Sequence, residues 1–499
     1  MRRVSLRFAT ILILCIFLAV ALSVVGQTRG VEGGQRYDRL VIRNAVIIDG
    51  NGTPPSGPSD IIVEGNAIRS VGRPRRGADA YTDEVHMIDG TGMYVLPGLI
   101  NLHAHLQDGR ADNPCPFEYE FKLWLACGIT TVRDVGSDAD KALAQRQKSR
   151  DGQIAAPRIF IYMTASGQTP EEGRQRVREI KKQGADGVKI FGLDRDIMAA
   201  ICDEAHKLGL RIAHHVGVEE TDAWDDAACG VTTIEHWYGV PDAALHGSQN
   251  FPPDYNYSDE SDRFRYAGHL WREADPEKLN KVLHTLVEKG VAWCPTFVIY
   301  EANRDLMRAQ NQPWFDDYLH PAVEKYFVPN PANHGSYQWN WSTEDEIFWK
   351  ENYKIWMKAV RKFARMGGLV GVGEDAGFIY QLYGFALIRE LELQQEAGFH
   401  PIDVIRNVTS VNAKLLGEEE RLGRVRAGFL ADLIVVDENP LENFKFLYPT
   451  GVMDLKDEKI VQRGGIKWTI KDGYVYDAPA MLSDVKKIVD EAKRAAGNP

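Results

Sequence analysis

The segment LPGLINLHAH, residues 96–105, starts as an apolar run and ends with two histidines that are separated by one residue. Such a run fits a strand that is buried on both faces, as strands of parallel sheets are. Residues two apart on a strand point to the same side, so His103 and His105 can reach one metal ion. The segment therefore predicts a buried strand that carries metal ligands at its carboxyl end.

Seven more segments show a short apolar strand that ends near a polar residue, in most cases after a glycine suited to a helix C-terminus. They are CGITTVRD (127–134), RIFIYMTA (158–165), QGADGVKIF (183–191), LGLRIAHH (208–215), CGVTTIEH (229–236), KGVAWCP (289–295) and GGLVGVGED (367–375). Helical stretches such as 170–183 and 385–398 lie between or after them. Eight strands with alternating helices predict the α/β class, with a (β/α)8 TIM barrel over residues 91–423.

The two flanks of this barrel have a different pattern. Residues 38–90 and 424–480 hold short alternating strands with Asp-Gly, Asn-Gly and Gly turns. The simplest assembly is one small composite β-sandwich domain formed by both chain ends. An amphipathic helix is expected within residues 481–499.

Residues 1–26 have the pattern of a secretory signal peptide. Three arginines precede an apolar run from Phe8 to Val25, and small residues follow it. We therefore expect an exported protein, periplasmic or secreted. The alternative is an uncleaved membrane anchor, because an apolar run of about 18 residues can just span a bilayer. Contact with a membrane is expected only in that case.

The composition narrows the range of partners. The formal net charge is −11 and no basic block is present, which argues against nucleic acid as a partner. A small-molecule or dipeptide substrate fits the chain, and a homo-oligomer is compatible with it. The five cysteines after the signal peptide have no metal-motif spacing, and we expect buried thiols, although export allows one or two disulfides.

Lys189 lies in the apolar strand GVKIF. A buried lysine must find a partner or lose its charge, because desolvation lowers its pKa. A neutral amine can react with carbon dioxide, and the resulting carbamate can bridge two metal ions as a carboxylate does. The alternative is a lysine that is paired with a nearby acid. Together with the other candidate ligands, the pattern favours N6-carboxylated Lys189.

Three more candidate ligands end strands of the predicted barrel. His214 ends the fifth strand, with His215 beside it, and at most one of the two can face the site because neighbours on a strand face opposite ways. We predict His214. His236 ends the sixth strand and Asp375 ends the eighth. Six metal ligands are therefore predicted at the carboxyl ends of the strands, where active sites of such barrels form: His103, His105, Lys189, His214, His236 and Asp375.

Taken in order, these motifs and the tail LGRVRAGFLADLIVVDENP (422–440) resemble the amidohydrolase superfamily over about residues 39–480. The imidazolonepropionase-related and Xaa-Pro dipeptidase (prolidase)-like hydrolases are the most similar group. The resemblance implies two divalent metal ions, commonly Zn²⁺. It implies that His103, His105 and Asp375 hold the inner ion, that carboxylated Lys189 bridges, and that His214 and His236 hold the outer ion. Val216, Trp237 and Glu374 stand where the family usually has other residues, so specificity does not carry over.

These features predict an amidohydrolase that cuts a C–N bond with a metal-bridged hydroxide. An Xaa-Pro dipeptide, an N-acyl amino acid or a cyclic amide would be the substrate. The alternatives are a lactonase or esterase on the same centre and a non-catalytic binding protein. Asp375 is the candidate for proton transfer. Tyr238 is a candidate for contact with the oxyanion or a substrate carboxylate, although packing in a lid is the favoured interpretation for it.

Two further features each leave two interpretations open. Arg133 ends the second strand, and it could hold a substrate carboxylate or support the site through an acid. The long loops 240–275 and 300–345 are rich in aromatic residues. These aromatics could form a lid over the site or pack into their own core.

Overall fold

The computed structural model describes residues 30–31, 33–75, 81, 85–216, 221–247, 249, 251–253, 255–256, 259–333 and 335–497. The predicted signal peptide, residues 1–26, lies outside this part of the chain. Within the described residues, no helix has the length and apolar character needed to cross a bilayer.

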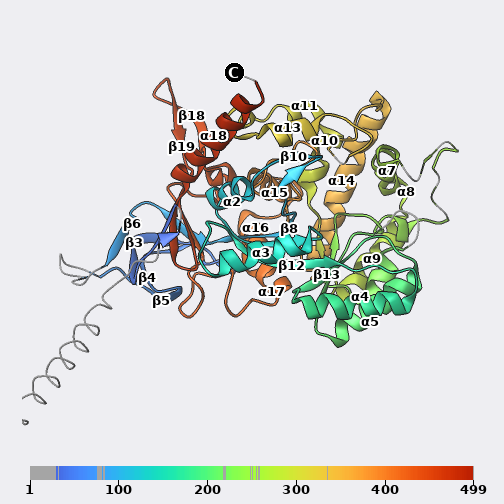
Figure 1. Cartoon of the computed structure of the whole chain (residues 1–499), viewed down its shortest axis with the longest axis horizontal. Coiled ribbons are helices and arrows are strands. Elements are labelled where there is room, and N and C mark those ends of the chain that lie inside the picture. The colour runs from blue at the N-terminus through green and yellow to red at the C-terminus, as the bar shows by residue number, and fades with distance from the viewer. Residues whose placement is uncertain are drawn as a thin grey trace, which may run out of the picture.

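A seven-stranded parallel sheet forms the wall of a barrel, with helices packed around it (Figure 1). Its strands follow chain order and are almost wholly buried: β8 (Leu99–Ala104), β11 (Ile129–Val135), β12 (Arg158–Thr164), β13 (Gly187–Ile190), β14 (Arg211–His214), β15 (Thr233–Glu235) and β16 (Ala292–Cys294). The surrounding helices include α2 (Phe117–Ala126), α3 (Ala139–Arg150), α4 (Pro170–Gln183), α5 (Arg195–Lys207), α6 (Ala223–Cys229), α9 (Pro276–Glu288), α14 (Thr343–Arg365) and α15 (Phe385–Glu396). The predicted barrel is confirmed.

The eighth predicted strand, residues 367–375, closes the barrel as an irregular segment. Trp293 and Val370 form an isolated parallel bridge on one side. On the other side, the Leu102 amide donates to the Val372 carbonyl at 3.0 Å. A Cβ on Gly373 would lie 2.6 Å from the Cβ of His103, so only glycine allows this approach. The close approach of the two backbones explains why residue 373 is a glycine.

Both ends of the chain build one ten-stranded sheet with its own core, which confirms the composite β domain. The sheet order is β1-β2-β21-β20-β17-β7-β3-β4-β5, with β6 beside β3. The strands are β1 (Gly30–Val31), β2 (Gly34–Arg36), β3 (Arg39–Ile47), β4 (Ser56–Glu64), β5 (Ala67–Gly72), β6 (His86–Asp89), β7 (Tyr94–Pro97), β17 (Leu433–Val436), β20 (Ile466–Lys471) and β21 (Tyr474–Asp477). The domain thus starts before residue 38 and extends past residue 90.

The first predicted strand divides between the two units. β7 belongs to the β domain and β8 to the barrel, with Gly98 between them. A Cβ on Gly98 would lie 2.2 Å from the Thr130 hydroxyl, so the chain passes tightly at this junction. Arg158 of β12 forms ion pairs with Asp432 and Asp472 of the β domain, which holds the two units together.

The remaining elements are short or lie at the C-terminus. The expected C-terminal helix is α18 (Ala478–Ala495), and β18 (Val452–Lys456) and β19 (Lys459–Arg463) form a separate hairpin (Figure 1). The others are β9 (Gly109–Arg110), β10 (Asn113–Pro114), η1 (Asp242–Ala244), α7 (Glu260–Ala267), α8 (Leu270–Glu273), η2 (Phe297–Tyr300), α10 (Glu301–Arg304), α11 (Leu306–Gln310), α12 (Phe315–Tyr318), α13 (Pro321–Phe327), α16 (Pro401–Arg406), η3 (Asn407–Val411), α17 (Asn412–Leu416) and η4 (Phe444–Leu447).

The aromatic loops serve both purposes that the sequence left open. Trp271 is buried, and Trp314 stacks on Phe385 at a centroid distance of 4.8 Å, so these rings fill a core. Phe264 and Tyr337 stack at 4.1 Å and also line the cavity at the mouth of the barrel. Tyr257 lies outside the described residues.

Candidate metal centre

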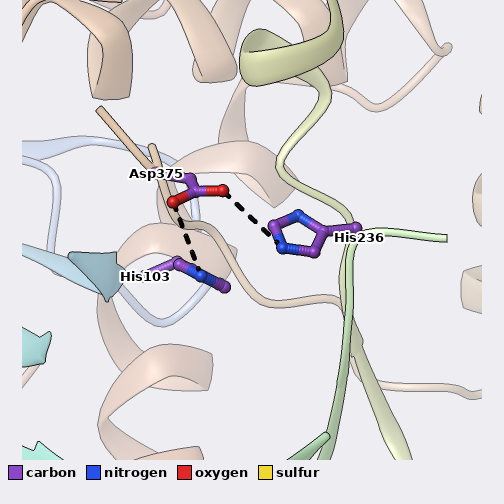
Figure 2. Close-up of side chains that lie close together, drawn as sticks. All are labelled: His103, His236 and Asp375. Atoms are coloured by element: carbon purple, nitrogen blue, oxygen red, sulfur yellow. Dashed lines mark ion pairs between the residues drawn. The ribbon is translucent and has the colours of Figure 1, made fainter. Parts of the chain in front are cut away.

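His103, His236 and Asp375 meet at the carboxyl ends of three barrel segments (Figure 2). The Nε2 atoms of His103 and His236 each lie 3.6 Å from a carboxylate oxygen of Asp375. These separations are too long for hydrogen bonds. Ligand atoms that share one zinc ion at about 2.0–2.2 Å lie roughly 3–3.6 Å apart. The three groups therefore have the spacing of ligands around one cation.

Two further predicted ligands border the same space. His105 Nε2 lies 3.2 Å from Asp375 Oδ1. Lys189 is buried, and its Nζ has no hydrogen-bond partner among the described residues. The alternative of a lysine paired with an acid is therefore wrong for this structure. Burial lowers the pKa of Lys189 to about 8, so the neutral amine is far more populated near neutral pH than in an exposed lysine.

The structure corrects the choice between His214 and His215. Lys189 pairs in register with Ala213, and both face the barrel interior. His215, two residues further on, faces the same way, and it lines the cavity 4.8 Å from the ring of His236. His214 faces the helices instead, where its Nδ1 lies 2.6 Å from Asp226 Oδ1. His215 is thus the candidate ligand, and His214 supports the strand from behind.

Two buried groups behind the cluster fix the orientation of its imidazoles. Glu235 Oε2 lies 2.6 Å from His103 Nδ1, and Thr296 Oγ1 lies 2.6 Å from His236 Nδ1. Each contact leaves the Nε2 atom turned toward Asp375, as contacts behind metal ligands typically do. Neither residue was predicted from the sequence. Glu235 directly precedes His236 in TTIEH, and this position was the only signal for it.

Arg133 supports this arrangement rather than a substrate. Its side chain is fully buried and donates to Glu235 Oε1 at 2.6 Å and to the Leu102 carbonyl at 2.5 Å. Burial alone would raise the pKa of Glu235, but the charge of Arg133 and the His103 contact hold it well below its usual range. Glu235 therefore stays ionised and can accept a hydrogen bond from the Nδ1–H of His103.

The backbone adopts a left-handed conformation at two of the candidate ligands. The φ angles are 63° at His236 and 51° at Asp375, a region that costs non-glycine residues energy. Hydrogen bonds hold both positions: the His236 amide donates to the Cys294 carbonyl at 2.9 Å, and the Asp375 amide donates to the His103 carbonyl at 2.8 Å. These hydrogen bonds to the surrounding barrel thus fix the orientation of the two side chains.

The charge states of the cluster suit a bound cation. Burial lowers the pKa of His103, His215 and His236, which favours the neutral imidazole that can donate a lone pair. Burial would raise the pKa of Asp375, but the surrounding histidines, led by His103, hold it well below its usual range. A neutral imidazole set, an ionised carboxylate and an unpaired lysine amine fit a divalent metal such as zinc.

Tyr238 lies behind the cluster rather than in the cavity. Its ring packs against His215 at a centroid distance of 4.9 Å, and its hydroxyl contacts Tyr300. This placement argues against contact between Tyr238 and the reacting atoms. Tyr300 lines the cavity in its place. Burial, followed by the influence of Tyr238, raises the pKa of Tyr300 well above its usual value, so its hydroxyl stays protonated.

A cavity of about 290 Å³ opens onto the cluster, a volume suited to a small ligand. Its walls combine aromatic rings with two arginines and a glutamine. The lining residues beyond the candidate ligands are Gln107, Arg110, Phe191, Arg263, Phe264, Ile299, Tyr300, Tyr326, Tyr337, Phe378 and Ile379.

A larger cavity of about 680 Å³ lies elsewhere and contains none of the candidate ligands. It is lined by residues of the β domain and by residues that precede or open the barrel strands. Arg158, Lys471 and Asp472 in its wall form ion pairs with neighbouring groups, which neutralise much of its charge. The smaller cavity is therefore the candidate active site.

Fold and site together define a TIM barrel with a candidate metal centre at the carboxyl ends of its strands. The profile of the amidohydrolase family matches residues 94–248 and 355–456, just over half of the chain. The chain belongs to this family. This match confirms the predicted superfamily. It also confirms that the chain belongs to a class of enzymes, the hydrolases that act on C–N bonds.

Individual relatives are more distant. A dihydroorotase of Thermoanaerobacter sp. (strain X514) is 33% identical over 94 residues, which cover 19% of this chain and 20% of that protein. The matches span 20–36% of the length of the first three dihydroorotases. A 5'-deoxyadenosine deaminase of Methanosarcina mazei is 23% identical, and the match covers 92% of this chain and 97% of that protein.

Solved structures share the fold. A Xaa-Pro dipeptidase with bound methionine superposes with a TM-score of 0.61 at 21% identity, over 88% of this chain and 100% of that one. A putative prolidase from Bifidobacterium longum gives a TM-score of 0.59 at 23% identity, over 91% of this chain and 99% of that one. These similarities extend over both the barrel and the β domain.

The assignment of His215 can be tested by metal analysis. We expect His215→Ala to lose roughly one metal equivalent per chain after zinc loading and dialysis, because its imidazole faces the cavity. We expect His214→Asn to retain the wild-type metal content, because its ring contacts Asp226 instead. Plasma mass spectrometry of the three proteins measures the ratio. Loss of metal from the His214 variant alone would show that the assignment is reversed.

Proposed function

We propose that this protein is a metal-dependent amidohydrolase that hydrolyses the C–N bond of a small substrate with a free carboxylate. The convergence of four imidazoles, a buried lysine and one carboxylate on a single cavity supports this proposal most strongly. Family membership supports the reaction class. The names of the similar solved structures, Xaa-Pro dipeptidase and prolidase, suggest dipeptides as the first substrates to test.

The proposed centre holds two divalent ions, with zinc as the metal. His103, His105 and Asp375 would hold the inner ion, and His215 and His236 the outer one. Lys189, carboxylated on its amine, would bridge them. When bound, the ions would lower the pKa of a water molecule and polarise the scissile carbonyl. Formation of the carbamate requires a neutral amine, and the burial of Lys189 favours it by lowering the pKa to about 8.

The chain's own residues provide the remaining chemistry. Asp375 lies beside the imidazoles of the candidate centre, where its carboxylate could accept a proton from the attacking water and pass it to the leaving nitrogen. The Tyr300 hydroxyl, which stays protonated, can donate a hydrogen bond to the developing oxyanion. The rings of Phe264, Tyr337 and Phe378 limit the access of bulk water to the cavity.

Arg110 supports the choice of an anionic substrate. The residue is only 7% exposed, yet its guanidinium forms no ion pair with a carboxylate among the described residues. Its Nη2 donates to the Tyr383 hydroxyl at 2.7 Å, and its Nε is buried without a partner. A buried charge without a counter-ion is costly. A substrate carboxylate that enters the cavity would provide that counter-ion and form a charge-assisted hydrogen bond.

The surroundings of Arg110 favour a compact substrate. The guanidinium lies 5.5 Å from the ring centroid of Tyr326 and 5.7 Å from that of Phe378. These rings restrict its movement, and Gly377 leaves room for it, since a Cβ there would lie 2.1 Å from Nη2. A carboxylate at Arg110 and a carbonyl at Asp375 would then belong to the same small molecule. Xaa-Pro dipeptides and N-acyl amino acids have this form.

The proposed reaction is tested by a hydrolysis screen with zinc-loaded protein. We expect turnover of at least one Xaa-Pro dipeptide or N-acyl amino acid, measured as released amine. Asp375→Asn is expected to reduce turnover by at least about 10³-fold, because proton transfer and one metal ligand are both impaired. Matched lactones serve as the second panel. Turnover of lactones alone would replace the proposal with a lactonase, and undiminished activity of Asp375→Asn would refute its role.

The role of Arg110 is tested with paired substrates. For a carboxylate substrate, we expect Arg110→Met to raise KM by about 10–100-fold with a smaller effect on kcat, since a hydrogen bond to a charged group contributes about 1.5–3 kcal/mol. For the matching carboxamide, the variant and the wild type should differ little. Arg110→Lys keeps the charge and is expected to be intermediate. Equal losses on both substrates would contradict a role in recognition of the carboxylate.

A further inference from the structure

Two cysteines meet where the barrel helices α5 and α6 pack together. The thiol of Cys202 hydrogen-bonds to the thiol of Cys229. Close by, the ring Nε2 of His206, one helical turn after Cys202, lies 3.1 Å from the carbonyl oxygen of Gly230, the residue after Cys229. This second contact fixes the spacing of the two helices at the position of the thiols.

The two thiols differ in access. Cys202 is 1% exposed, whereas Cys229 at the C-terminal end of α6 is half-buried and open to solvent. The hydrogen bond from Cys202 lowers the pKa of Cys229, and the same bond raises the pKa of Cys202. An accessible thiol that ionises more readily attacks first in thiol–disulfide exchange. The inner thiol is then placed to resolve the intermediate.

We propose that Cys202 and Cys229 form an intramolecular disulfide, a modification site that links α5 to α6. The oxidant is a small or protein disulfide. The Cys229 thiolate attacks one sulfur of this disulfide and releases one thiol, which leaves a mixed disulfide. The Cys202 thiolate then attacks Cys229 sulfur and releases the second thiol. In total, two protein thiols are oxidised and one disulfide is reduced to two thiols.

The link would act on the support of the candidate metal centre. α6 also carries Asp226, three residues before Cys229, and Asp226 is the buried partner of His214. His214 in turn ends β14, which positions His215. A disulfide between α5 and α6 would hold Asp226 against this strand. It would also restrict the unfolded chain, which raises thermal stability when the folded geometry is unstrained. Export, as the N-terminal segment predicts, would expose the pair to an oxidising environment.

The pairing is tested on the full chain, independently of any activity. Purified protein is reduced, freed of reductant and incubated with oxidised glutathione while folded. It is then denatured, alkylated with iodoacetamide and digested for peptide mass analysis. We expect the peptides that contain Cys202 and Cys229 to be linked and unalkylated, with a mass lower than their sum by two hydrogen atoms. Calorimetry is expected to give a higher Tm for the oxidised than for the reduced protein.

Variants separate the pair from the other cysteines. Cys229→Ser and Cys202→Ala are each expected to abolish the linked peptide and the rise in Tm, whereas Cys115→Ser, a control elsewhere in the fold, should keep both. Complete alkylation of Cys202 and Cys229 after oxidation would overturn the proposal. A stable glutathione adduct on Cys229 would also overturn it, because it would show that Cys202 cannot resolve the intermediate.

Discussion

The site depends on a carboxylate that the barrel holds at its mouth, away from most solvent. Asp375 is 4% exposed and faces the Nε2 atoms of three histidines, which are better suited to binding a cation than to carrying a charge. An ionised carboxylate in such surroundings is unfavourable unless a positive charge compensates it. A bound divalent ion satisfies the carboxylate and the imidazoles together. The metal centre is therefore the arrangement that makes these buried groups compatible with one another.

The rest of the barrel can be understood as support for that arrangement. Arg133 keeps Glu235 ionised, and Glu235 orients His103, so a complete ion pair lies directly beneath the inner part of the site. On the opposite side, Asp226 orients His214 behind the strand that carries His215. The Glu235–His103 and Asp226–His214 pairs are both buried, and each hydrogen bond fixes the orientation of one imidazole ring. The glycine at position 373 completes the support, since it lets the last segment approach His103 closely enough to close the barrel.

The sequence predicts the fold well because its signals are local and repeated. Apolar strands that end in His, Lys or Asp place a side chain at the barrel mouth whatever the details of packing. His103, His105, Lys189, His236 and Asp375 were all found in this way, and the structure brings them to one cavity. The choice between His214 and His215 failed because it depends on the register of β14 against β13. Two adjacent histidines carry no local signal for that register.

Residues that act through tertiary contacts could not be predicted in this way. Arg110 lies in the short strand β9 that follows the first barrel strand, and only its burial without an ion-paired carboxylate distinguishes it from a surface arginine. Thr296 and Asp226 belong to different segments from the histidines that they orient. Tyr238 was a candidate because it follows His236 closely in sequence, but the chain turns at His236 and directs the tyrosine behind the site.

The binding of divalent ions by these groups can be tested by anomalous X-ray scattering. Crystals of zinc-loaded protein would be measured just above and just below the zinc absorption edge. We expect two anomalous peaks in the cavity, within coordination distance of Asp375 and the imidazoles of His103, His105, His215 and His236, with Lys189 between the peaks. A cavity without anomalous density, or peaks held by other residues, would contradict it.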